Sequence, residues 1–155
     1  MYQKQKEKAF ALLKENEISR NYMTEYWIPY KDYLDPTDRF INFSCDNLEE
    51  LQGYLDLIEN LLRADHTAKI FVSLYGCDEF NNEQCIHAET LILFSRLSLS
   101  EIEQIFHEPD DIFPSDIGEE NVYSKPTFII DENGDLIPAA GLPIDGYSVY
   151  YCWWD

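Results

Sequence analysis

Residues 69–76, KIFVSLYG, constrain the fold of this chain more than any other stretch. A nearly unbroken apolar run of this length is typical of a strand buried in a sheet. A second apolar stretch, residues 90–95, follows it along the chain. The two stretches predict a β-hairpin, and we expect the remaining elements to cover it.

Two helices are predicted before this hairpin. Residues 2–17 carry apolar side chains on one side and lysines around the rest, which is the pattern of a surface helix. The second helix follows Asp46, an N-cap that Glu49 completes as a capping box, and runs to about residue 64. Its apolar stripe comprises Leu48, Leu51, Leu55, Ile58 and Leu62, widened by Tyr54 and Leu61.

The pattern of apolar residues and turns predicts four further strands. They cover residues 39–45, 127–131, 136–139 and 147–154. Between the second and third of them, Asn133 and Gly134 favour the positive φ angles of a type I′ hairpin turn. Because helices and strands do not alternate strictly, we predict a single α+β domain over residues 1–155. It should have a mostly antiparallel sheet with helices packed on one face.

The segments between these elements carry weaker signals. Two overlapping capping boxes, which pair Ser98 with Glu101 and Ser100 with Glu103, predict a short third helix. Residues 77–87 and 108–120 are predicted to be loops, and long loops often carry binding residues. Residues 21–38 are rich in aromatic side chains and show no clear periodicity, so no element is predicted there.

The charge of the chain excludes two classes of partner. Its 155 residues include 30 acidic against 11 basic side chains, for a net charge of -19. Each contact with a phosphate needs Lys or Arg, so direct binding to nucleic acid or to an anionic membrane is not expected. A hydrophobic fraction of 45% is too high for a disordered chain, so a folded domain is expected.

The amino terminus predicts neither export nor a membrane span. Its apolar patch, residues 9–13, is too short for the core of a signal peptide, and no stretch approaches the ~20 apolar residues of a transmembrane helix. The cysteines lack the spacing of a disulfide framework; they are Cys45, Cys77, Cys85 and Cys152. We therefore expect a cytoplasmic protein with reduced thiols.

No motif specifies an enzyme, a metal or a cofactor. His87 and Glu89 have the H-x-E spacing of zinc deaminases, but the P-C-x-x-C part of that site is missing. Cys77, Cys85 and His87, with or without Cys152, are ligand types that zinc prefers, although their spacing fits no familiar zinc motif. Buried cysteines without a metal are common, so metal binding stays open. We predict no catalytic residue, no metal and no cofactor.

Residues 131–135 imitate the start of a calcium-binding loop. Asp131, Asn133 and Asp135 have the right spacing, but the glycine stands at the fourth position and Leu142 replaces the bidentate glutamate. The predicted hairpin turn explains these residues better.

Acidic residues are concentrated in the second half of the chain. Residues 97–124 contain eight acidic side chains and no Lys or Arg, with apolar residues interleaved among them. A solvated, solubilising face would show a similar charge run. Carboxylates with apolar anchors also suit docking on a basic protein surface, and the charge here exceeds what solubility requires. The predicted contact residues are Glu108, Asp110, Asp111, Phe113, Asp116, Glu119, Glu120 and Tyr123.

With these features the chain resembles the small acidic immunity proteins of bacterial toxin systems, such as contact-dependent growth inhibition and other polymorphic toxin systems. The resemblance is one of type: size, a single α+β domain, negative charge, aromatic residues and no catalytic motif. It implies a cognate basic toxin, a nuclease, whose cleft this protein would block with carboxylates in place of phosphates. Two alternatives stay open. One is a DNA mimic that inhibits a DNA-binding enzyme, and the other is a small enzyme or metal-binding protein whose site no motif marks.

Overall fold

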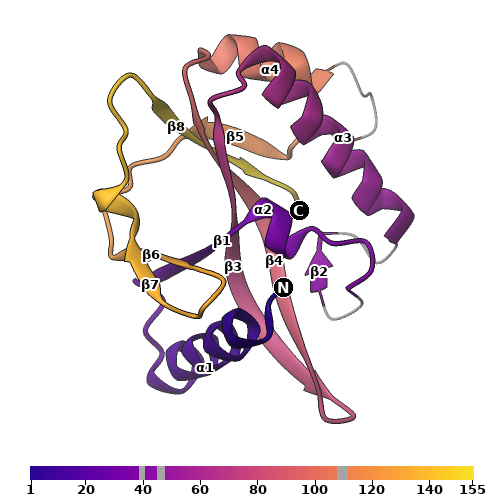
Figure 1. The fold of residues 1–155 in the computed structure, drawn as a ribbon, viewed down its shortest axis with the longest axis vertical. Coiled ribbons are helices and arrows are strands. Elements are labelled where there is room, and N and C mark those ends of the chain that lie inside the picture. Colours follow the sequence, from indigo (N-terminus) through magenta and orange to yellow (C-terminus); the bar gives the residue numbers. More distant parts are fainter. Residues whose placement is uncertain (39–40, 45–47, 108–111) are drawn as a thin grey trace.

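In the part of the chain that the computed structural model describes, residues 1–38, 41–44, 48–107 and 112–155, eight strands form one sheet (Figure 1). The strands are β1 (Glu25–Pro29), β2 (Ile41–Phe43), β3 (Lys69–Phe80), β4 (Glu83–Ser95), β5 (Asp116–Glu119), β6 (Thr127–Ile130), β7 (Leu136–Pro138) and β8 (Ser148–Trp153). Their order is β5-β8-β4-β3-β1-β6-β7, and β2 pairs with β4. Only β1 with β6 and β2 with β4 are parallel among these described strands, which confirms the predicted mostly antiparallel sheet.

The β3–β4 hairpin is longer than predicted. Residues 77–87, expected to form a loop, continue both strands, and the turn consists of Asn81 and Asn82 with φ angles of 51° and 63°. Asparagine tolerates the left-handed conformation that both central positions of a type I′ turn require. The loop prediction was wrong because the end of the hairpin projects beyond the rest of the fold (Figure 1), where exposed residues such as Asp78 and Glu79 show no apolar alternation.

Helices cover one face of the sheet, as predicted. Within the described residues they are α1 (Gln3–Ser19), α2 (Tyr30–Tyr33), α3 (Leu48–Ala64) and α4 (Leu99–His107). Their apolar side chains form the main core with alternate residues of the strands, such as Val72 and Leu91. In α3, Leu57 and Leu61 are fully buried, whereas Leu55 of the predicted stripe is only half-buried. None of the helices in the described chain is long and apolar enough to span a bilayer.

The start of α4 confirms one of the two predicted capping boxes. The N–H of Glu101 donates to Ser98 Oγ (3.2 Å), and the N–H of Ser98 donates to the Glu101 carboxylate (2.7 Å). Ser100 already lies inside the helix, so it does not begin a second box.

The turn between β6 and β7 differs from the predicted type. Gly134 has a φ of 78° and donates its N–H to the Asp131 carbonyl (3.0 Å), but Asn133 is not in the left-handed region. A type I′ turn requires positive φ at both central positions, so that part of the prediction was wrong, although the hairpin is confirmed. The Asp131 carboxylate accepts the N–H groups of Asn133 and Asp135 (both 2.9 Å), which accounts for the resemblance to a calcium loop.

The prediction of a loop over residues 108–120 was also wrong in part. β5 lies within this range and pairs with β8 at one end of the strand order. The predicted N-cap Asp46 and the predicted contact residues Glu108, Asp110 and Asp111 lie outside the described residues.

The second face of the sheet carries a smaller core that covers only part of it. The ring of Trp27 packs against Phe71 and Phe94, with centroid distances of 5.8 and 6.0 Å. Val122 and the 3₁₀ helix η1 (Ala139–Gly141), with apolar residues from 142–147, pack over these rings. The remaining part of this face carries the polar residues described next.

Candidate functional site

Two adjoining cavities lie where the smaller core ends. The larger, about 520 Å³, lies between α1, the start of β1 and the β3–β4 hairpin. The smaller, about 290 Å³, lies beside β5 and β8 on the second face of the sheet. Glu25, Ser73 and Lys125 line both cavities, so the two lie side by side, and we refer to them together as the open groove.

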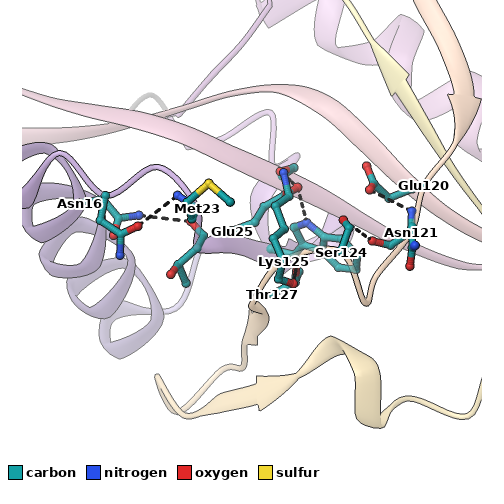
Figure 2. Close-up of polar contacts among 12 residues, drawn as sticks. Asn16, Met23, Glu25, Glu120, Asn121, Ser124, Lys125 and Thr127 are labelled. Carbon is teal, nitrogen blue, oxygen red and sulfur yellow. Dashed lines mark hydrogen bonds and ion pairs between the residues drawn. The ribbon is translucent and has the colours of Figure 1, made fainter.

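A fixed ion pair lies at the middle of the open groove. The Glu25 carboxylate accepts hydrogen bonds from Ser73 Oγ (2.6 Å) and Trp27 Nε1 (2.8 Å) and pairs with Lys125 Nζ (2.5 Å). Burial opposes ionisation of Glu25, but the contacts with Lys125, Ser73 and Trp27 outweigh it and lower its pKa. Figure 2 shows this pair between Asn16 of α1 on one side and Glu120 on the other. The single positive charge of the groove is therefore already neutralised within the described residues.

The smaller cavity combines two carboxylates with two aromatic rings. Asp116 of β5 lies opposite Trp153 of β8, and its Oδ2 accepts the Tyr151 hydroxyl (2.8 Å). Glu120 follows β5, and its Oε1 accepts the N–H of Asn121 (3.0 Å). Within the described chain neither carboxylate forms an ion pair, so this end of the groove has a net negative charge.

Glu120 is partly removed from solvent. Its burial, and then the nearby Glu25 carboxylate, raise its pKa above the ordinary value, although Lys125 and the Asn121 N–H act in the opposite direction. A carboxylate with a raised pKa is one whose charge is incompletely solvated. A cation placed next to Glu120 would stabilise the charged form of this carboxylate.

The larger cavity is also acidic and aromatic. His87 Nε2 contacts Asp78 Oδ2 (2.8 Å), and the His87 ring stacks against Tyr75 with a centroid distance of 5.9 Å. Tyr75 lies at a register shift of the β3–β4 pairing, and its side chain is 59% exposed. Phe80, two residues beyond Asp78 and therefore on the same side of β3, is 76% exposed at the end of the hairpin. Exposed aromatic side chains thus continue from the groove toward the hairpin turn.

The predicted contact residues do not all lie together. The structure brings Asp116 and Glu120 into the smaller cavity, but β-strand alternation places Glu119 on the opposite face, across from the buried Tyr150. Phe113 stacks on His107 (4.2 Å between centroids) and is 37% exposed, and Tyr123 is 64% exposed outside both cavities.

Sequence reasoning missed most of the groove. Glu25 and Tyr22 belong to the segment for which no element was predicted, and Lys125, which directly follows the acidic run of residues 97–124, was given no role. The parallel pairing of β1 with β6, in which Glu25 lies opposite Thr127, is what brings Glu25 next to Lys125. The alternation of Tyr151 and Trp153 was visible in the sequence, but nothing there indicated which side of β8 faces the core.

The cysteines that suggested a metal site do not converge, because Cys77 and Cys85 occupy adjacent pairs of the β3–β4 ladder and their side chains point to opposite faces of the sheet. Cys77 is buried opposite Ile86, and burial raises the pKa of its thiol, which disfavours the thiolate needed for metal ligation or nucleophilic attack. Asp78, not a cysteine, contacts His87. Over the described residues, no three His, Cys, Asp or Glu side chains converge in an arrangement that could hold a metal ion.

Comparison with known proteins adds no assignment. The chain matches no family model, no curated protein and no solved structure.

Proposed function

We propose that this protein acts by binding: it is a cytoplasmic immunity protein that neutralises a basic bacterial toxin, a nuclease, through the open groove. One observation carries the proposal. Asp116 and Glu120 line a cavity beside Tyr151 and Trp153, and neither of them forms an ion pair in the described chain. Carboxylates flanked by aromatic rings are the complement of a basic protein surface with Arg or Lys side chains.

The burial of Glu120 argues against a purely solubilising role. Residues that only increase solubility are stabilised by full exposure to water, whereas burial raises the pKa of Glu120 and disfavours its charged form. The free energy that this costs is recovered when a cation binds. The net charge of -19 also speeds encounter with a basic partner, most strongly at low ionic strength.

The test compares groove and non-groove charge reversals in cells of the native bacterium. Tagged wild-type protein should co-purify with one basic protein, which is lethal when expressed alone and harmless when co-expressed with the wild type. The double variant Asp116→Lys, Glu120→Lys should lose both capture and protection. Glu119→Lys, a single charge reversal on the opposite face of β5, should retain both.

Two results would overturn the proposal. In one, no lethal basic partner is found or the groove variant protects as well as the wild type. In the other, the protein inhibits several unrelated DNA-binding enzymes, which would establish the DNA-mimic alternative. Circular dichroism and urea unfolding of each variant show that a loss of capture is not a loss of fold.

A further inference from the structure

The smaller cavity is suited to one kind of side chain. We propose that it binds the guanidinium group of a single arginine of the partner, which pairs with Glu120 and packs against the rings of Tyr151 and Trp153. This inference rests on the proposed function, because it names the partner group that enters the open groove.

Glu120 has an oxygen available for such a pair. Its Oε1 accepts the Asn121 N–H, and no hydrogen bond or ion pair engages Oε2 within the described chain. Its backbone is held in place because the Glu120 N–H donates to the Val149 carbonyl of β8 (2.8 Å). The held backbone and the Asn121 contact together limit the positions that the carboxylate can take at the cavity, which lowers the entropy cost of binding.

Lys125 does not fill the site from within. Its ammonium group is paired with Glu25, which in turn is held by Ser73 and Trp27. Moving Lys125 to Glu120 would leave the Glu25 carboxylate, whose side chain is only 14% exposed, without its counter-charge. The Glu25–Lys125 pair is thus a wall of the cavity, and the cation that neutralises Glu120 has to come from outside.

The aromatic rings favour arginine over lysine. A guanidinium group is planar and weakly hydrated, so it can stack on a ring while its N–H groups reach a carboxylate. The ammonium group of lysine is compact and strongly hydrated, so it loses more hydration free energy when it enters the cavity. The protein already contains such a contact, because the Arg96 guanidinium lies 5.1 Å from the centroid of the Tyr147 ring.

The first experiment titrates the isolated protein with N-acetyl-arginine amide and follows backbone and indole N–H signals by NMR. Saturable shifts should map to Trp153, Gly118 and Glu120, with a dissociation constant of about 1 mM, which corresponds to roughly -4 kcal/mol. N-acetyl-citrulline amide, a neutral molecule of the same shape, should cause no saturable shift, and the lysine analogue should bind more weakly. Equal shifts from the citrulline compound, or shifts that map elsewhere, would overturn the inference.

Two matched variants locate the binding group. Glu120→Gln should weaken arginine binding about tenfold, whereas Glu119→Gln, which removes the same charge from the opposite face, should leave it within twofold. Trp153→Leu should also weaken arginine binding. This variant removes an aromatic ring and leaves every charge of the cavity in place, so it tests the packing contact separately. Similar affinities for the two glutamine variants would overturn the inference.

The pH dependence supplies a second readout. The ionisable groups that face the cavity are Glu120, Asp116, Glu25, Lys125 and Tyr151. Glu120 has a raised pKa, so, as the pH is lowered from 7, wild-type affinity should begin to fall over an interval above that in which an ordinary glutamate titrates. Glu120→Gln should show a smaller dependence over the same interval. Parallel pH profiles for the two proteins would count against Glu120 as the binding group.

The outcomes separate this inference from the proposed function. If a lethal basic partner is neutralised equally well by wild type and Glu120→Gln, the proposed function stands and the arginine site does not. If the arginine amide binds at Glu120 but no lethal partner exists, the site stands and the immunity function does not.

Discussion

Asp65 shows how a buried carboxylate stays ionised in this protein. It is 7% exposed and accepts hydrogen bonds from Thr67 Oγ1 (2.6 Å), Ser95 Oγ (2.8 Å) and the Arg96 N–H (2.8 Å). Burial opposes its ionisation, but these hydrogen bonds outweigh burial and lower its pKa to about 2. The network joins the end of α3 to the end of β4, so we expect it to stabilise the fold.

This network predicts a pH-dependent contribution to stability. The folded pKa of Asp65, about 2, lies below the ordinary value of 3.8, so its contribution is complete above about pH 4 and is lost as the pH falls toward 2. Asp65→Asn should therefore lower the free energy of unfolding by about 2 kcal/mol at pH 7, and by less at pH 3.

Urea unfolding of both proteins across this pH range measures the difference. Asp145→Asn, at an exposed position, is the control and should match the wild type throughout. A constant difference between Asp65→Asn and wild type from pH 7 to pH 3 would show that the carboxylate charge contributes nothing.

At the scale of elements, the β3–β4 hairpin organises the molecule. Its inner half is buried between the two cores. Its outer half carries Tyr75 and Phe80, which are exposed, and His87, which is paired with Asn42 of β2. The register of this half depends on a turn whose two central residues must adopt the left-handed backbone conformation. The hairpin therefore links the turn at Asn81 and Asn82 to the position of the groove residues.

Substitutions in this turn should change stability in opposite directions. Asn82 has a φ of 63°, where β-branched residues are strained, so Asn82→Val should destabilise the protein by about 1–2 kcal/mol. Asn82→Gly should be neutral or slightly stabilising, because Asn-Gly is the preferred type I′ pair. The midpoints of urea unfolding give both values. A valine variant as stable as the glycine variant would mean that the turn is not the type I′ turn described.

At the scale of the whole molecule, charge opposes compactness. The net charge of -19 is held in a folded chain whose sheet face and hairpin expose many carboxylates. Like charges at the surface repel, and the folded state brings them closer than the unfolded state does. Part of the stability contributed by the two cores is therefore offset by repulsion.

Salt should stabilise this protein. Raising NaCl from 10 to 150 mM shortens the Debye length from about 30 to about 8 Å, which screens repulsion between surface carboxylates. We expect the melting temperature at pH 7 to rise by about 2–4 °C, equivalent to roughly 1 kcal/mol. Differential scanning calorimetry measures it. Near pH 4.2, the isoelectric point of the sequence, the same salt change should have little effect. A fall in melting temperature at pH 7 would show that attractive ion pairs dominate instead.

Local patterns in the sequence were sufficient to predict most elements. The apolar runs of β3 and β4, the amphipathic spacing of α3 and the capping box of α4 each depend on residues close together in the chain. The same patterns predicted the α+β class and the helices on one face. They failed at residues 77–87 and 116–119, because exposed or edge strands need no apolar alternation.

The sequence by itself determined the charge, the aromatic content and the elements, because these depend on composition and on short-range spacing. Only the tertiary structure decided which charged side chains lie together. Glu25 and Lys125 are 100 positions apart and meet through the parallel pairing of β1 with β6. Glu119 and Glu120 are neighbours in sequence, yet they lie on opposite faces because a strand alternates. A site formed by strand pairing brings together residues that are far apart in the sequence, and short-range patterns do not show which strands pair.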